Sequence, residues 1–187
     1  TLLERERRPR RHSASTAHDW SKTCRTSMRR LWAGDCVVSV DDLNKAAPVL
    51  DGLTLIKAPM GAGKTQKVGA PWVAEARKRG TVMAICHRVS LVSEMSTRLD
   101  LPHYQKASPE DILGAGGVAV CLPSITARMV AEVMPQPDYV FIDEVAQVLR
   151  FLESKDTCST ALADAEGVFD ALVRIIRNAK AVLVADA

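Results

Sequence analysis

Short, continuous apolar runs are the most regular feature of this chain from residue 53 onward. They are four to six residues long and are separated by more polar segments of helical or loop character. Runs of this kind are typical of strands in a parallel sheet whose two faces are both covered. We therefore predict an α/β fold with a mainly parallel sheet, and with strands at 53–56, 81–86, 118–122, 139–142 and 181–184.

Helical spacing of apolar positions occupies much of the sequence between these runs. Apolar residues at i, i+3 and i+4 predict helices over 91–99, 126–133, 148–152 and 168–178. A further helix is expected from Thr65 toward Arg79. It should be kinked or split near Gly69 and Pro71, because proline lacks an N–H and clashes with the preceding turn. Residues 101–116 are polar and predict a connecting loop with one helical turn.

The loop after the first predicted strand carries Gly61, Gly63, Lys64 and Thr65 in the order of a phosphate-binding loop. Glycines let the backbone turn successive N–H groups toward phosphate oxygens, and the next helix begins with its positive end at the same anion. Lys64 is expected between the β- and γ-phosphates of ATP, and the Thr65 hydroxyl on Mg²⁺. A glycine-containing turn without a ligand is the alternative. The residues expected to bind the nucleotide are Pro59, Met60, Gly61, Ala62, Gly63, Lys64, Thr65 and Gln66.

Two adjacent acids, Asp143 and Glu144, end the fourth predicted strand. Asp143 is expected to hold Mg²⁺ through water, together with Thr65, and Glu144 to polarise the water that attacks the γ-phosphate. Lys64 and Glu144 are therefore the predicted catalytic residues. Acids at a helix start also favour its positive end, so a purely helix-stabilising role is the alternative for Glu144.

Polar residues also follow the second and third predicted strands. His87, Arg88 and Ser90 come after the second strand, and Ser124 and Thr126 come after the third. Ligands gather at the carboxyl ends of strands in open α/β sheets, so we expect these residues to meet the backbone of a single-stranded nucleic acid, DNA in the first instance. The alternative is that Ser90, Ser124 and Thr126 only cap their helices.

Positive charge is concentrated near the beginning of the chain. Residues 1–30 contain nine Lys or Arg and three Asp or Glu, so this stretch is strongly basic although the whole chain has a net charge of only +3. We predict a basic, partly disordered extension over 1–50, either solvated or in contact with nucleic acid, and one lobe over 51–187. Trp20 and Trp32 could stack on bases, although tryptophan more often anchors a core. Both ends suggest a fragment of a longer protein.

The five cysteines are scattered, without a Cys-x-x-Cys pair or a histidine at ligand spacing. This pattern argues against a zinc site or a disulfide framework and favours a reducing compartment. No apolar run approaches the ~20 residues that span a membrane, and no apolar core follows the Arg-rich start as it does in a secretory signal. We expect no membrane partner and a cytoplasmic location, or the host nucleus for a viral protein.

With these residues in place, the chain resembles the first motor lobe of superfamily 2 helicases. It is most similar to the origin-of-replication-binding helicases of herpesviruses and the related phage and plasmid replication proteins. The Ala58 that replaces the first glycine of the common phosphate-loop pattern is frequent in that superfamily. The matching segments are 58–65 for motif I, 86–91 for motif Ia, 121–124 for motif Ib, 143–149 for motif II and 182–187 for motif III.

The resemblance implies a RecA-like P-loop NTPase lobe of three layers that uses ATP and Mg²⁺ to unwind or remodel replication DNA. It also implies a second lobe with an arginine finger, which is missing here, so this lobe alone is expected to be inactive. In lobes of this type, the strand at 181–184 lies between those at 53–56 and 139–142.

Two other functions remain open from the sequence. A P-loop kinase would pass the γ-phosphate to a small acceptor, and direct pairing of the strands at 53–56 and 140–142 would favour that class. A nucleotide-gated nucleic-acid-binding module would bind ATP without turnover.

Overall fold

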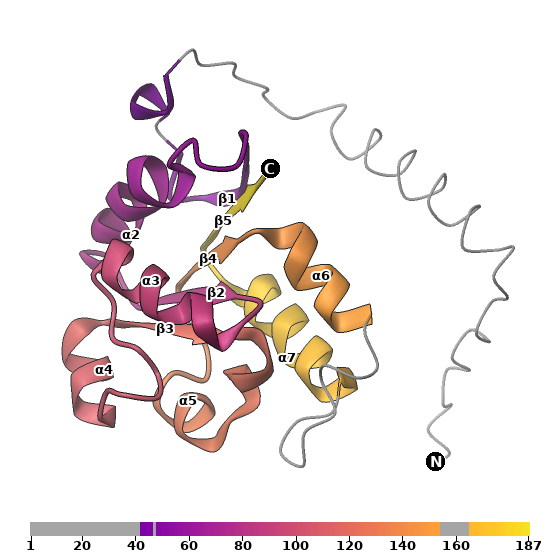
Figure 1. Ribbon diagram of the computed structural model, residues 1–187. Helices are drawn as coiled ribbons and strands as arrows, with labels where there is room; N and C mark the ends of the chain where they lie inside the picture. The colour runs from indigo at the N-terminus through magenta and orange to yellow at the C-terminus, as the bar shows by residue number, and fades with distance from the viewer. Residues whose placement is uncertain (1–41, 47, 154–164) are drawn as a thin grey trace, which may run out of the picture. The chain divides into compact units, whose positions relative to one another are not determined.

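A computed structural model describes residues 42–46, 48–153 and 165–187 of the chain (Figure 1). Within these ranges, five parallel strands form one sheet in the order β1-β5-β4-β2-β3. The strands are β1 (Gly52–Lys57), β2 (Val82–Cys86), β3 (Gly117–Cys121), β4 (Tyr139–Asp143) and β5 (Ala181–Asp186). The α/β class and the parallel sheet predicted from the apolar runs are confirmed.

The strand order agrees with the order that the resemblance implied. β5 lies between β1 and β4, with Val182 opposite Leu53 on one side and Val140 on the other. Direct pairing of β1 with β4, which would have favoured a kinase, does not occur in this sheet. Because all five strands run in the same direction, the segments that follow β1, β2, β3 and β4 emerge at the same edge of the sheet.

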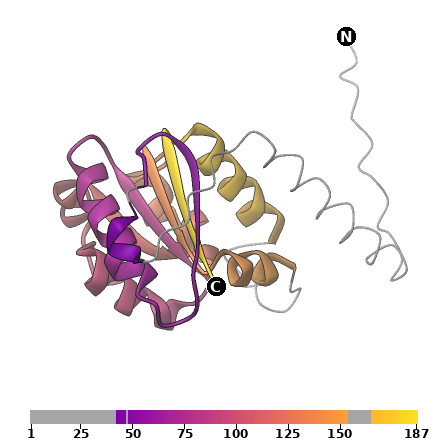
Figure 2. The same cartoon turned by 90° about the horizontal axis from the view of Figure 1, so that it is seen from above.

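Helices cover both faces of the sheet (Figures 1 and 2). α2 and α3 lie on one face, and α6 and α7 on the other. The helical elements of the described ranges are η2 (Leu43–Lys45), η3 (Thr65–Gly69), α2 (Ala70–Arg77), α3 (Val89–Leu99), α4 (Pro109–Ala115), η4 (Leu122–Thr126), α5 (Arg128–Val133), α6 (Val145–Glu153) and α7 (Ala165–Asn178). None of them has both the length and the apolar character that crossing a membrane requires.

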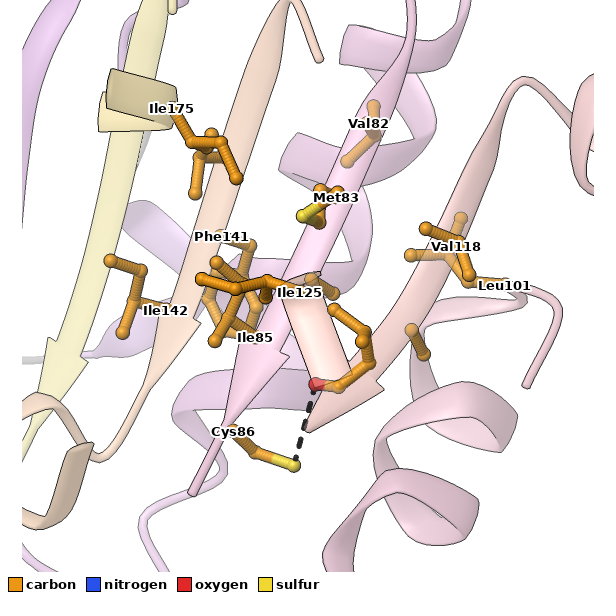
Figure 3. Close-up of a cluster of buried hydrophobic side chains, with 14 of the residues drawn as sticks. Val82, Met83, Ile85, Cys86, Leu101, Val118, Ile125, Phe141, Ile142 and Ile175 are labelled. Atoms are coloured by element: carbon orange, nitrogen blue, oxygen red, sulfur yellow. Dashed lines mark hydrogen bonds between the residues drawn. The ribbon is translucent and has the colours of Figure 1, made fainter. Parts of the chain in front are cut away.

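Burial explains why the apolar runs became strands. Every residue of β2 and β3 is buried, as are all residues of β4 and β5 except the last of each. Side chains from both faces form one core, in which Ile175 of α7 joins Phe141 and Ile142 of β4 (Figure 3). β1 is different, since Leu53 remains 71% exposed at the edge of the sheet.

The helix after the glycine-rich loop is divided in two, as Gly69 and Pro71 predicted. η3 is a π-helix in which the Ala70 N–H donates to the Thr65 carbonyl, and α2 continues from it with Pro71 in its first turn. The wider turn accommodates a proline that has no N–H to donate. Gly69 allows close packing on the sheet, because an added Cβ would lie only 3.0 Å from Phe141 Cζ.

The segment 101–116, predicted as a loop with one helical turn, contains a longer helix than expected, because α4 occupies Pro109–Ala115. Ser108 and Asp111 form a capping box: the Asp111 N–H donates to Ser108 Oγ, and the Ser108 N–H donates to Asp111 Oδ2. Gly116 ends the helix in the left-handed conformation, with φ of 64°.

The helix expected over 126–133 is shorter than predicted. The chain forms the 3-10 helix η4 up to Thr126 and turns extended at Ala127, with ψ of 134°, before α5 begins at Arg128. Two short helical elements, η4 and α5, therefore occupy the stretch after β3.

The segment just before β1 packs on the lobe. The Trp72 indole N–H donates to the Val49 carbonyl over 3.1 Å, and Leu50 lies against the core. Residues 1–41 of the predicted basic extension, with Trp20 and Trp32, lie outside the described residues.

Candidate functional site

A cavity of about 390 Å³ opens at the carboxyl edge of the sheet, where β1, β2 and β4 end. The glycine-rich loop, the residue after β2, one face of α3 and the tip of β4 surround it. The lining residues are Met60, Gly61, Gly63, Lys64, Thr65, Gln66, Cys86, His87, Leu91, Glu94, Met95, Arg98, Asp143 and Glu144. The loop and the two acids, which are 78 residues apart or more in sequence, are therefore brought together as predicted.

The glycine-rich loop adopts a conformation that requires its glycines. Gly61 and Gly63 have φ of 74° and 86°, in a region that other residues rarely enter. At Gly63 an added Cβ would also lie 3.3 Å from the Lys67 side chain. Pro59 and Ala62 are not among the lining residues but shape the loop, since the Ala62 N–H donates to the Pro59 carbonyl.

Lys64 is buried where the loop meets β4, with 5% of its side chain exposed. Its Nζ donates to the carbonyl of Ala58 at 2.9 Å and to that of Pro59 at 3.3 Å. The same ammonium lies 3.4 Å from Glu144 Oε1. One cation therefore links the loop to the second of the two acids.

Thr65 and Asp143 are joined directly, with the Thr65 hydroxyl donating to Asp143 Oδ2 over 2.9 Å. Burial raises the pKa of Asp143, while the Thr65 hydrogen bond opposes that shift and the charge of Glu144 adds to it. A hydroxyl and a carboxylate at this distance are a pair of hard oxygen donors, the kind of ligand that Mg²⁺ prefers.

Glu144 has a strained backbone, with φ of 52° in the left-handed region. A non-glycine residue in this region is uncommon, and such strain clusters at functional sites. The conformation marks the turn from β4 into α6, where the Gln147 and Val148 N–H groups donate to the Glu144 carbonyl. The side chain is 29% exposed and lines the cavity.

His87 lies in the cavity beside these acids, although the sequence placed it with the nucleic-acid residues. Its Nδ1 is buried and has no hydrogen-bond partner among the described residues. Burial lowers the pKa of His87, the charge of Arg88 lowers it further, and the charges of Glu144 and Asp143 oppose both effects.

Arg88 and Ser90 are exposed at the start of α3, outside the set that lines the cavity. Arg88 occupies the N-cap position but its side chain makes no capping hydrogen bond, and Ser90 lies inside the first turn. The capping alternative is therefore wrong for Ser90.

Ser124 and Thr126 hydrogen-bond within the chain. The Ser124 hydroxyl donates to the Tyr104 hydroxyl over 3.0 Å and lies 3.2 Å from Cys121 Sγ, and the Thr126 hydroxyl donates to the Pro123 carbonyl. Burial, followed by the hydrogen bond with Cys121, raises the pKa of Tyr104 to about 12. Neither hydroxyl caps α5, and neither residue lines the cavity, so the capping alternative is wrong here too.

One wall of the cavity, contributed by α3, was not predicted from the sequence. Leu91, Glu94, Met95 and Arg98 line the cavity, and Glu94 and Arg98 form an ion pair there. Their i, i+3, i+4 and i+7 spacing places them on one face of a helix that follows a central strand, which is a signal that the sequence does contain.

No family model matches the chain. An uncharacterized protein of Picosynechococcus sp. (strain ATCC 27264 / PCC 7002 / PR-6) is 27% identical over 118 residues, which are 62% of this chain. The chain spans 12% of that relative's length.

Proposed function

We propose that residues 51–187 form a RecA-like lobe that binds and hydrolyses ATP with Mg²⁺, as part of a DNA helicase of the replication-origin-binding type. The single observation that carries the proposal is the 2.9 Å hydrogen bond from Thr65 to Asp143, at the tip of a glycine-rich loop whose two glycines have positive φ. The placement of β5 between β1 and β4 supports the same class over a kinase.

The residues present fit the two ligands. The cavity is large enough for a phosphate chain, and Lys64 supplies a cation beside it. The Lys64 ammonium can give up its hydrogen bonds to two loop carbonyls and donate to phosphate oxygens instead. No group of three or more His, Cys, Asp or Glu side chains able to hold a metal occurs in the described part of the chain. A nucleotide-bound Mg²⁺ needs no such group, because phosphates and water supply most of its ligands. Thr65 and Asp143 would hold the ion, which when bound neutralises charge on the phosphates.

In hydrolysis, the chain's own groups have distinct tasks. The Glu144 carboxylate accepts a proton from water as the water oxygen bonds to the γ-phosphorus, and the bond from that phosphorus to the bridging β–γ oxygen breaks to release ADP and phosphate. Lys64 stabilises the negative charge on the phosphates. A second lobe with an arginine finger would complete the site, so turnover belongs to the full-length protein.

The test of this function is Mg·ATP binding and phosphate release, with and without single-stranded DNA, in the full-length protein. Lys64→Ala should weaken binding at least tenfold, because it removes the cation buried against the loop. Glu144→Gln should bind normally and lose roughly 10²- to 10⁴-fold in turnover. Lys78→Ala and Glu132→Gln are matched controls, since both side chains form exposed ion pairs away from the cavity.

Three results would contradict the proposal in different ways. Normal turnover by Glu144→Gln would remove Glu144 as the base. Phosphate transfer to an acceptor instead of water would indicate a kinase. Tight binding without turnover in the presence of DNA would indicate a nucleotide-gated binding module.

Contact with DNA rests on Arg88, whose exposed charge has no ion-pair partner among the described residues. Arg88→Ala should weaken single-strand binding and reduce its dependence on salt by about one unit of logarithmic slope, since one phosphate contact is lost. Arg128→Ala, at an exposed arginine on α5, is the control. An unchanged salt dependence would place the DNA path elsewhere.

A further inference from the structure

His87 presents the one buried side-chain nitrogen or oxygen without a hydrogen-bond partner in the described part of the chain. Buried polar atoms are nearly always paired, so an exception inside a candidate site needs an explanation. His87 follows the last residue of β2, which pairs with β4, and it shares the cavity with Glu144. The imidazole therefore lies at the end of the strand next to the one that carries the proposed base.

The contacts of Glu144 suggest when His87 Nδ1 would form a hydrogen bond. Lys64 Nζ, 3.4 Å from the Glu144 carboxylate, is its ion-pair partner here, and the same Nζ also bonds to two loop carbonyls. Lys64 would turn to the phosphates when a nucleotide binds. Glu144 then loses its cation at the point where its carboxylate has to be held toward a water molecule.

A neutral imidazole suits the task that remains. It carries one N–H donor and one acceptor nitrogen, and burial together with the neighbouring Arg88 charge lowers the pKa of His87, which favours the neutral ring. The φ of Glu144 describes its backbone only, and the direction of its carboxylate depends on separate side-chain torsions. A hydrogen-bond donor beside the carboxylate would restrict those torsions.

We propose that His87 is a positioning residue for hydrolysis: with nucleotide bound, its Nδ1–H donates a hydrogen bond to the Glu144 carboxylate and holds it toward the attacking water. This inference rests on the proposed ATPase function. It also moves His87 from the nucleic-acid side, where its sequence neighbours Arg88 and Ser90 remain, to the nucleotide side. The turn after β2 would then connect the two ligands, with His87 at one and Arg88 at the other.

The first test needs no turnover and uses the 187-residue chain. Histidine-selective ¹⁵N NMR with Mg²⁺ and the non-hydrolysable β,γ-imido analogue of ATP should show His87 protonated on Nδ1, with a shift on binding that is absent in Glu144→Ala. The His87→Asn spectrum identifies the resonance. The amides of Gly61 and Gly63 report nucleotide binding in the same titration. Loop amides that do not move would contradict the proposed function, whereas loop amides that move beside an unchanged His87 would overturn only this inference.

The second test measures kinetics in the full-length protein. His87→Leu should leave KM for ATP within about twofold, because nucleotide binding does not depend on His87. It should lower kcat at least tenfold, because the Glu144 carboxylate is no longer held toward the attacking water. His87→Asn should recover kcat to within about threefold, since its amide offers a donor close to the position of Nδ1. The double variant with Glu144→Gln should be no slower than Glu144→Gln alone, as expected for residues that act as a unit.

His103 provides the matched control, because it is a buried histidine whose Nδ1 already accepts the Gln105 N–H. His103→Asn should change only thermal stability. Normal kcat in His87→Leu, or a loss confined to DNA affinity, would overturn the inference. If His87→Leu lowers the thermal midpoint sharply, His87→Asn is compared with wild type instead. If His87→Asn is as stable as wild type but its kcat falls as far as that of Glu144→Gln, the inference is also overturned.

Discussion

The ends of β4 and β3 lie at the same edge of one sheet, and both are followed by polar side chains, yet the two regions differ in how those side chains are held. After β3, Ser124, Tyr104 and Cys121 hydrogen-bond to one another. After β4, Glu144 has a positive φ and the Asp143 carboxyl has a raised pKa because it is buried. The hydrogen bonds after β3 stabilise the fold. The strained and buried groups after β4 lower its stability and are held in place by the surrounding structure.

This difference shows that a polar residue at a strand end is weak evidence of function by itself. The sequence presented Ser124 and Glu144 both as candidate site residues, Glu144 for catalysis and Ser124 for contact with nucleic acid. Unfavourable features separate them, since strain, a buried charge and an unpaired nitrogen persist only where the surrounding structure imposes them. Such features gather around the glycine-rich loop and β4.

The largest effect that would test this comparison is expected at Gly63. Gly63→Ala places a Cβ at φ of 86° and close to Lys67, at a cost of about 1–2 kcal/mol for the left-handed conformation. If the loop must keep this conformation to bind phosphate, the affinity for Mg·ATP should fall roughly tenfold in a fluorescence titration.

Gly114→Ala is the matched control for that substitution. Gly114 lies in α4 with open space where a Cβ would be, so alanine should leave nucleotide affinity unchanged and stabilise the helix by at most about 1 kcal/mol. Equal nucleotide affinities for the two variants would mean that the loop conformation is unrelated to binding.

A smaller effect is expected at the other strand end. Ser124→Ala removes the hydrogen bond to Tyr104 and should lower the free energy of unfolding by about 1 kcal/mol, seen as a lower midpoint in thermal denaturation. Affinity for single-stranded DNA should not change. Ser93→Ala, at an exposed serine on α3, should alter neither property. Weaker DNA binding at unchanged stability would instead restore the sequence-based role of Ser124.

The smallest effect concerns the pH dependence of stability at Asp143. Because its pKa is raised in the fold, the folded protein binds this proton more tightly than the unfolded chain does. The contribution of Asp143 to stability is therefore full below the ordinary aspartate pKa and is lost as the pH rises through the folded-state value. Without Mg²⁺, Asp143→Asn should melt at a higher temperature than wild type at pH 7, by a margin that shrinks toward acid pH.

Adding Mg·ATP to the same melting experiment tests the proposed role of Asp143 in holding the metal ion. Mg·ATP should raise the thermal midpoint of wild type much more than that of Asp143→Asn, since the amide is a poorer ligand for the ion. A lower midpoint for Asp143→Asn at pH 7 without Mg²⁺ would show that the buried carboxylate is stabilising, and the contrast between the two strand ends would fail.

The sequence predicted what depends on local chemistry. The buried strands were predictable from their apolar runs. The spacing of Gly61, Gly63, Lys64 and Thr65 located the loop that lines the cavity. The α4 helix was predictable from the Ser108 and Asp111 capping box, which was overlooked in a polar stretch.

Other features depend on contacts that spacing alone does not reveal. The position of His87 after a strand indicated the correct edge of the sheet, but not that the ring lies in the cavity while Arg88 is exposed. The network of Ser124 involves Tyr104, twenty residues earlier, so only the folded chain brings the two hydroxyls together.

The edge position of β1 has a consequence for the chain in solution. Among the described strands, β1 pairs only with β5, so the backbone N–H and C=O groups along its outer side lack a strand neighbour, and Leu53 and Leu55 present apolar side chains to water beside them. Edges of this kind act as templates for strand addition between molecules. Preparations of this chain by itself should therefore be prone to concentration-dependent self-association that begins at β1, a hazard that comes from the same strand that leads into the glycine-rich loop.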